Sequence, residues 1–244
     1  MAGHSKWAKV KHFKGAIDAK RARIFAKLSR ELTVAARLGG GDPEMNPRLR
    51  MVLLKARAAN MPSDNTDRAI RRGVGGDDAA HYEDLTYEIF GPGGVAILAE
   101  ISTDNRNRTA AEIRSLLTKN GGSIATAGSV TRLFQRRGQI FIARDTVNED
   151  RLMEVAVEAG ADDFRADQEG FEILTDPARL ETVVKTLETA GFPSASAEIA
   201  FLPLVHATVE DAAHAAAAAR LLDLLEDHDD VKAVHANADL PATV

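Results

Sequence analysis

The sequence predicts an α+β protein, with an N-terminal three-helix domain followed by two α/β sandwich domains, a ferredoxin-like one inserted into the other. Three observations predict this fold class. Apolar residues recur at helical spacing over residues 16–73, whereas several short segments after residue 80 alternate with the period of a strand. In the middle of the chain, residues 138–202 give the complete order β-α-β-β-α-β, which is ferredoxin-like and indicates an insertion.

These patterns divide the chain into four expected parts. They are a flexible basic arm over residues 1–15, a helical domain over 16–78, a split α/β domain made of 81–135 plus 204–240, and an inserted ferredoxin-like domain over 136–203. The flanking pieces of the split domain would complete one fold around the insertion.

The predicted first helix spans residues 16–38 and ends at Gly39. Its apolar and cationic side chains fall on opposite sides at about 100° per residue, and only Arg21 falls on the wrong side. The apolar side holds Ile17, Ile24, Phe25, Leu28, Leu32 and Ala35, and the cationic side holds Lys20, Arg23, Lys27, Arg30 and Arg37.

Two further helices are predicted before residue 75. The second is capped by Asn46, has Pro47 at its first position, and ends before Pro62. The third is short, spans about residues 63–73 and ends at a glycine.

Strands dominate the predictions after residue 80, separated by single helices. In the split domain we expect strands at Leu85–Phe90, Val95–Ile101, Val130–Phe134, His206–Val209 and Val231–His235, with helices after Asn105 and over Ala212–Glu226. In the inserted domain we expect strands at Gln139–Ala143, Asp163–Ala166, Gly170–Leu174 and Glu198–Leu202, with helices over Glu149–Ala159 and Pro177–Ala190.

Charge is distributed very unevenly along the chain. Residues 1–38 contain ten Lys and Arg against two acidic residues, a net charge of +8. Residues 1–80 contain 17 basic and 8 acidic residues, or +9, and because the whole chain is −5, residues 81–244 carry −14. A basic N-terminal part on an acidic body indicates a protein that meets a polyanion at one end.

The predicted nucleic-acid contacts lie in that basic part. In the arm, lysines can neutralise phosphates and the single tryptophan can stack on an unpaired base; these residues are Lys6, Trp7, Lys9, Lys11, His12 and Lys14. The alternative is a solvated tail whose Trp7 docks on its own body. Lys20, Arg23, Lys27 and Arg30 extend the same surface along the first helix, unless they are only a solvated helix face. Arg71 and Arg72, with Arg68, are either a second phosphate contact or cations that suit a helix C-terminus.

No pattern in the sequence indicates an enzyme, a cofactor or a metal site. Cysteine is absent, and no glycine cluster is part of a phosphate-binding loop or a G-x-G-x-x-G turn. The run Glu226–Asp230 can bind a cation but is more typical of a solvated helix end, and Asp104–Arg108 is more typical of a helix cap than of a surface site using Arg106 and Arg108. No apolar stretch of about 18 residues could cross a membrane.

Several ordered segments together resemble the YebC/PmpR family over essentially the whole chain. They are residues 1–7, 18–21, 32–37, 39–43, 46–50, 60–62 with 68–70, 91–94, 103–109 and 128–130. Two positions depart from the family pattern: His235 stands where tyrosine is common, and Thr131-Arg132 stand where an apolar or aromatic pair often follows Gly128–Val130.

This resemblance implies an N-terminal helical domain with two α/β domains, one inserted in the other. It implies a non-enzymatic protein of gene expression, described in some members as a DNA-binding transcriptional regulator and in others, including a mitochondrial translational activator, as acting on the ribosome. Because the resemblance begins at Met1, we expect no presequence and a cytoplasmic protein.

DNA and the ribosome therefore remain alternative targets. We find no helix-turn-helix pair with a short turn, since the loop Gly39–Met45 is too long for that motif. A flexible basic arm with one aromatic suits structured RNA or single strands equally well. A third possibility is that the acidic α/β body is a protein-binding module.

Overall fold

The computed structural model describes residues 18–75, 82–144, 147–168 and 170–240 of the 244-residue chain. These residues form two compact units. The first unit comprises residues 18–23, 82–135 and 201–240, and the second comprises residues 24–75 and 136–200. Among the described residues, no helix is long and apolar enough to cross a membrane.

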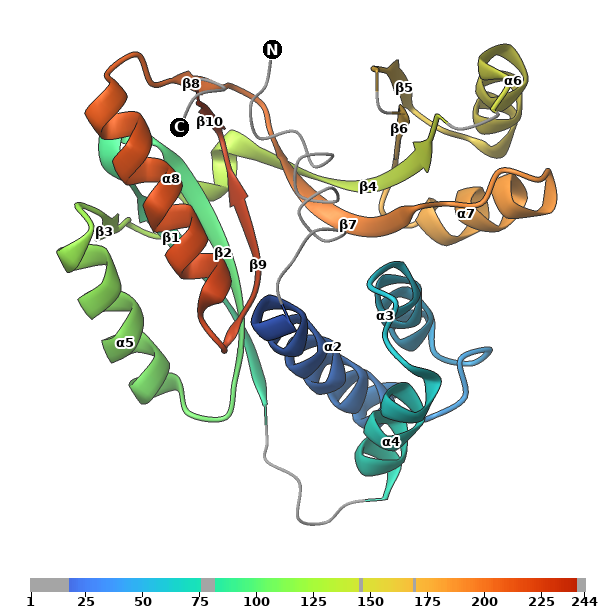
Figure 1. Ribbon diagram of the computed structural model, residues 1–244, viewed down its shortest axis with the longest axis horizontal. Coiled ribbons are helices and arrows are strands. Elements are labelled where there is room, and N and C mark those ends of the chain that lie inside the picture. Colours follow the sequence, from blue (N-terminus) through green and yellow to red (C-terminus); the bar gives the residue numbers. More distant parts are fainter. Residues whose placement is uncertain (1–17, 76–81, 145–146, 169, 241–244) are drawn as a thin grey trace. The chain divides into compact units, whose positions relative to one another are not determined.

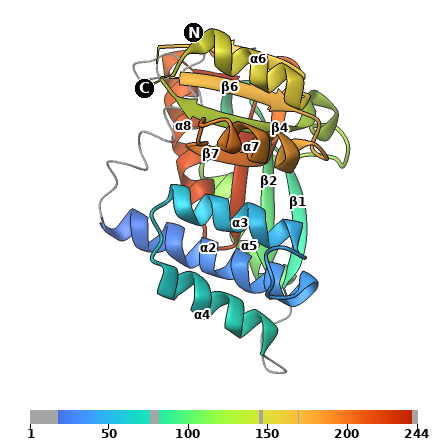
Figure 2. The ribbon, with the colours of Figure 1, turned by 90° about the vertical axis from the view of Figure 1, so that its right-hand side faces the viewer.

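Three helices form the N-terminal part, as predicted: α2 (Asp18–Gly39), α3 (Pro47–Ala58) and α4 (Ser63–Val74). They lie side by side (Figure 2) around a core of Leu28, Leu32, Ala35, Leu49, Val52, Ala56, Met61 and Ala69. At the end of α2, Gly40 takes a left-handed φ of 86°, a conformation that glycine adopts without steric cost. Asn46 caps α3 as predicted, because its side chain accepts a hydrogen bond from the Leu49 amide.

Helices α3 and α4 are joined by residues 59–62 alone. A helix pair with a short connection is therefore present, which the expectation based on the loop Gly39–Met45 did not include. Asn60 makes this turn possible by adopting a φ of 55°, a left-handed conformation that asparagine tolerates better than most residues.

The rest of the second unit has the predicted ferredoxin-like order β4 (Phe134–Ala143), α6 (Glu149–Ala159), β5 (Asp163–Ala166), β6 (Gly170–Thr175), α7 (Leu180–Thr189) and β7 (Ser196–Pro203). The sheet has the strand order β5-β6-β4-β7, and α6 and α7 lie on one of its faces (Figure 1). Alternate residues of the central strands, Ile140 and Ile142 on β4 and Phe171 and Ile173 on β6, pack under these helices. The predicted ranges of α6 and β5 are the observed ones.

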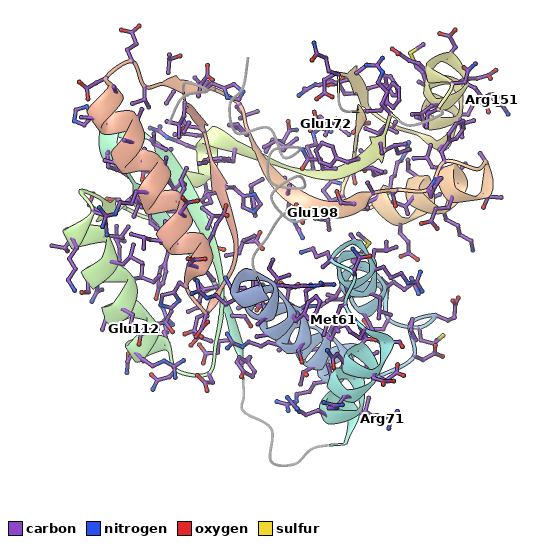
Figure 3. The ribbon with its side chains drawn as sticks, in the orientation of Figure 1. Met61, Arg71, Glu112, Arg151, Glu172 and Glu198 are labelled. Atoms are coloured by element: carbon purple, nitrogen blue, oxygen red, sulfur yellow. The ribbon has the colours of Figure 1, made fainter. Side chains whose placement is uncertain are left out.

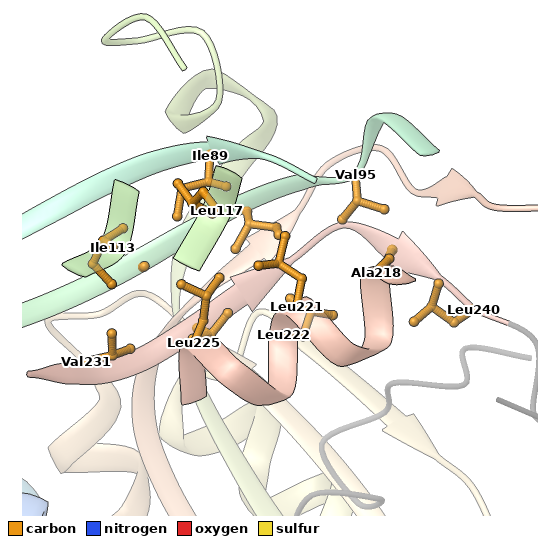
Figure 4. Packing of buried hydrophobic residues seen from close by; sticks show 14 of the residues in the cluster. Ile89, Val95, Ile113, Leu117, Ala218, Leu221, Leu222, Leu225, Val231 and Leu240 are labelled. Carbon is orange, nitrogen blue, oxygen red and sulfur yellow. The ribbon is translucent and has the colours of Figure 1, made fainter. Parts of the chain in front are cut away.

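The first unit is a second α/β sandwich. Its strands are β1 (Glu83–Phe90), β2 (Ala96–Thr103), β3 (Ser123–Ile124) and β9 (Val231–Ala236), in the order β3-β1-β2-β9. Helices α5 (Arg106–Lys119) and α8 (Ala212–Asp227) cover one face, where Ile89, Ile113, Leu117, Leu221 and Leu225 form a buried core (Figure 4). The turn between β1 and β2 is a short 3₁₀ segment, Pro92–Gly94. A separate pair of short parallel strands joins β8 (Ala207–Thr208) to β10 (Ala238–Asp239).

The predicted strand at Val130–Phe134 is wrong. Residues Thr131–Leu133 form a 3₁₀ turn, and Phe134 begins β4. The reason lies in Glu88 of β1, whose carboxylate accepts hydrogen bonds from the backbone amides of Gly128, Val130 and Thr131 at 2.6, 2.6 and 2.9 Å. Desolvation alone would raise the pKa of Glu88, but these amide donors together lower it below its ordinary value.

Candidate nucleic-acid interface

The six predicted contacts in the arm, Lys6, Trp7, Lys9, Lys11, His12 and Lys14, lie outside the described residues. Their role remains a prediction. The structure can therefore place only the predicted contacts that lie on α2 and α4.

Helix α2 carries Lys20, Arg23, Lys27 and Arg30 between its start and its middle, as the sequence predicts. Arg23 is exposed and forms an ion pair of 2.8 Å with Asp227 of the first unit. Lys27 and Arg30 are half-buried, and the fully buried side of the helix begins at Leu28. Residues 32–36 are all buried, so this cationic side does not continue into the middle of the helical core.

Helix α4 presents the other predicted cations. Arg68, Arg71 and Arg72 are exposed, and among the described residues no carboxylate lies within ion-pair distance of any of them (Figure 3 labels Arg71). Gly73 holds this part of α4 close to α2, since a β-carbon at that position would lie 2.4 Å from the Thr33 carbonyl oxygen. The arginines are thus fixed to the helical core while their guanidinium groups face solvent.

Helix α3 is also basic, but two of its cations, Arg50 and Lys55, form ion pairs inside the second unit. Arg50 forms an ion pair of 2.5 Å with Glu181 of α7, and Lys55 lies 3.7 Å from both Glu31 of α2 and Glu198 of β7 (Figure 3 labels Glu198). The apolar side chains of Met51 and Leu54 on the same helix pack against the core of the ferredoxin-like part. Sequence reasoning did not single out α3, because ion pairs between distant segments leave no local pattern.

The loop between α2 and α3 is fixed by side-chain hydrogen bonds. Asn46, which is buried, donates from Nδ2 to the carbonyl oxygens of Ala35 and Gly40, at 2.8 Å each. Arg50 donates to the carbonyl oxygens of Pro43 and Glu44. The loop therefore has a defined conformation at the end of the helical part where α2 and α4 also end.

Two family profiles match the chain. One, described as the TACO1/YebC protein N-terminal domain, matches residues 5–76, and the other, described as the TACO1/YebC second and third domain, matches residues 82–238. The chain belongs to the TACO1/YebC family. The resemblance to the YebC family expected from the sequence motifs is thereby confirmed.

Full-length relatives support this membership. A "probable transcriptional regulatory protein" of Halothermothrix orenii is 50% identical over 243 residues, covering 99% of this chain and 96% of the relative. One of Geobacter sulfurreducens is 50% identical over 240 residues, covering 98% and 96%. The crystal structure of a conserved hypothetical protein from Aquifex aeolicus superposes with a TM-score of 0.87 at 43% identity, covering 97% of this chain and 98% of the other.

In this TACO1/YebC protein the segment Thr103–Thr109 is structural. Asn105 caps α5 by accepting from the Arg108 amide, so the capping prediction is confirmed. The Arg108 guanidinium contacts Asp104 and the buried Asp230, at 2.8 and 3.1 Å, and these hydrogen bonds raise its pKa above the ordinary value. The alternative of a surface site using Arg106 and Arg108 is not favoured, because Arg108 is committed to these carboxylates.

The acidic run Glu226–Asp230 includes Asp230, the buried carboxylate that Arg108 contacts. Ligand atoms of Glu112, His228 and Asp230 lie within 4.8 Å of one another (Figure 3 labels Glu112). However, His228 Nδ1 accepts a hydrogen bond from the Asp230 amide, so a neutral ring carries its proton on Nε2, which lies 3.2 Å from Glu112 Oε2. Asp230 also accepts from the hydroxyls of Thr103 and Thr109. These hydrogen bonds connect the start of β9 to α5, so the side chains of His228 and Asp230 already have partners within the protein.

Proposed function

We propose that this protein is a non-enzymatic regulator of gene expression that binds nucleic acid through its N-terminal part. The observation that carries the proposal is the group of exposed arginines on α4, Arg68, Arg71 and Arg72, which no described carboxylate neutralises. The wider charge distribution supports it. Residues 18–74 contain thirteen basic and six acidic residues, or +7, whereas residues 81–244 carry −14. The names of the curated relatives, probable transcriptional regulatory proteins, support a regulatory role.

Phosphate contact is the mode of binding that α4 supports best. In helix-turn-helix proteins the first residues of the second helix read the bases. The first turns of α4 instead carry Asp64 and Asp67, and its arginines follow them along the helix. Contacts to phosphates position a protein without reading sequence. This favours a second candidate within the same class, a translation factor that binds structured RNA or the ribosome, beside a DNA-binding transcriptional regulator.

The test compares the full-length protein with two matched double variants. Arg71→Gln/Arg72→Gln removes two of the proposed phosphate contacts, and Arg114→Gln/Lys119→Gln removes two exposed cations from α5 on the acidic body. Binding to duplex DNA, structured RNA and purified ribosomes is measured by anisotropy or sedimentation at several salt concentrations. If both arginines contact phosphates, the slope of log K against log salt should become shallower by about 1.8 on duplex DNA, since each contact contributes about 0.9.

The control variant should bind as the unchanged protein does. Equal affinity and equal slope for Arg71→Gln/Arg72→Gln and the unchanged protein would contradict the proposal. Binding that is insensitive to salt would instead support the third possibility, an apolar protein contact made by the α/β body. If the unchanged protein binds duplex DNA more tightly than ribosomes, the transcriptional regulator is favoured. Tighter binding to ribosomes favours the translation factor.

A further inference from the structure

The end of the helical part exposes three large apolar side chains. Leu38 in the last turn of α2 is 70% exposed, Met45 in the following loop is 78% exposed, and Val74 at the end of α4 is 60% exposed. We call this set the apolar end. Isolated exposed apolar residues are ordinary, but these three lie on segments that meet at one end of the helical part, since Gly41 of the loop lies against Val74.

The backbone beneath the apolar end is well fixed. Asn46 ties the loop to Ala35 and Gly40, as described above, and a β-carbon at Gly41 would lie 2.7 Å from Val74 Cγ2. The loop therefore packs directly on the end of α4. Because these side chains project from a rigid support, little ordering entropy would oppose their binding to a partner.

The charges around the apolar end include arginines that no described carboxylate neutralises. The loop contains two carboxylates, Asp42 and Glu44. Together with the stronger hydrogen bond that Arg50 donates to Glu181, their charges raise the Arg50 pKa above its ordinary value, against the opposing effect of desolvation. Arg71 and Arg72 have no such counter-ion among the described residues. Arg71 lies one helical turn before Val74 and hence on the same side of α4.

The exposed apolar pair on α6 lacks this combination. Met153 and Val157 on α6 are 44% and 62% exposed, but Glu149, Asp150, Glu154 and Glu158 accompany them on the same helix. A polyanion would be repelled there. At the apolar end, by contrast, exposed apolar side chains adjoin arginines that no described carboxylate neutralises.

We propose that the apolar end contacts unpaired nucleobases while Arg71 and Arg72 hold the adjacent phosphates. Apolar side chains pack on base faces only where bases are unstacked, because a paired duplex presents its phosphates and groove edges instead. The partner is thus a single strand, a loop or a distorted helix rather than a regular duplex. This inference rests on the proposed nucleic-acid-binding function and names the part of the nucleic acid that is recognised.

The experiment uses the full-length protein and two RNA probes of equal length and charge, a hairpin with a long unpaired loop and a fully paired blunt duplex. Leu38→Gln/Met45→Gln/Val74→Thr removes the apolar end, and Met153→Gln/Val157→Thr is the matched control on α6. The first variant should bind the hairpin roughly tenfold more weakly, with the salt slope unchanged, and should bind the duplex within about twofold of the unchanged protein. The control should bind both probes normally.

A second readout needs no variant. Exposed methionines oxidise to the sulfoxide, and a partner that covers the side chain slows the reaction. The hairpin should protect Met45 from dilute peroxide and leave Met153 unprotected, as measured by peptide mass spectrometry, while the duplex should protect neither.

Equal losses on hairpin and duplex, no loss on either, or failure of the hairpin to protect Met45 would overturn the inference. The proposed function would survive all three results if Arg71→Gln/Arg72→Gln still flattened the salt slope. Absence of any salt-dependent binding by the unchanged protein would instead overturn the proposed function and this inference together. If Leu38→Gln/Met45→Gln/Val74→Thr abolished binding to anionic lipid vesicles and left RNA binding intact, the apolar end would belong to a membrane-binding surface. That result would contradict the inference.

Discussion

Replacing Asn46 by alanine should lower the local unfolding free energy of the helical part by about 3 kcal/mol. The buried side chain makes three hydrogen bonds: it accepts from the Leu49 amide at 3.1 Å and donates to the Ala35 and Gly40 carbonyl oxygens at 2.8 Å. Loss of an N-cap costs about 1 kcal/mol, and loss of each buried neutral hydrogen bond costs about 1 kcal/mol more. The sum follows because all three bonds are lost at once.

Two other asparagine caps provide matched controls. Asn105 on α5 and Asn148 on α6 each accept one backbone amide, from Arg108 and Arg151, and both are exposed. Alanine at either position should cost only about 1 kcal/mol. The difference of about 2 kcal/mol isolates the two bonds that Asn46 donates.

The measurement is hydrogen exchange of the full-length protein followed by mass spectrometry. A chain with several cores need not unfold in one step, so local opening free energies are more informative than a single denaturation midpoint. Peptides within residues 24–75 report on Asn46→Ala, and peptides within α6 report on Asn148→Ala. If the two variants reduce protection by the same free energy, the Nδ2 hydrogen bonds contribute nothing and the reasoning fails. Asn46→Asp, which keeps the cap but loses both donors, should be at least as destabilising as Asn46→Ala.

Two further predictions concern buried or shared carboxylates in the first unit. Nuclear magnetic resonance titration should give Glu88 a pKa below 4.5. Because the pKa of Glu88 is lower in the folded than in the unfolded protein, Glu88 stabilises the loop fully above its unfolded pKa. This stabilisation is lost as pH falls through the folded pKa. Glu88→Gln should expose the Val130 amide to hydrogen exchange at neutral pH, and unchanged protection of that amide would contradict the prediction. Asp230→Ala should destabilise the first unit by about 2–4 kcal/mol, since it leaves Arg108 and two threonine hydroxyls without their shared acceptor. The exposed neighbour Asp229→Ala should cost about 0.5 kcal/mol or less by the same exchange measurement, and equal effects of the two changes would count against the network.

Local signals in the sequence determined most of the fold. Helical periodicity placed α2, α3 and α4, and cap residues such as Asn46 and Asn105 marked helix starts. The element order over residues 138–202 gave the ferredoxin-like topology, which the strand order β5-β6-β4-β7 confirms. These features are readable because each depends on residues within one or two turns of the chain.

The same reasoning could not predict strands of only two residues. β3, at Ser123–Ile124, and β10, at Ala238–Asp239, are too short to show any alternation, and β8 was expected to be longer than Ala207–Thr208. The segment after Gly128 looked like a strand because it contains apolar residues. A carboxylate about forty residues earlier, Glu88, holds it as a turn instead.

For the candidate site, the sequence by itself determined which residues are basic and where along the chain they gather. Only the tertiary structure decided which of those charges face solvent. On α3, Arg50 and Lys55 are paired with Glu181 and Glu198, whereas Arg71 and Arg72 on α4 have no described carboxylate partner. The physical reason is that an ion pair depends on distance in space, and folding brings α3 beside strands and helices that lie more than a hundred residues away in the sequence.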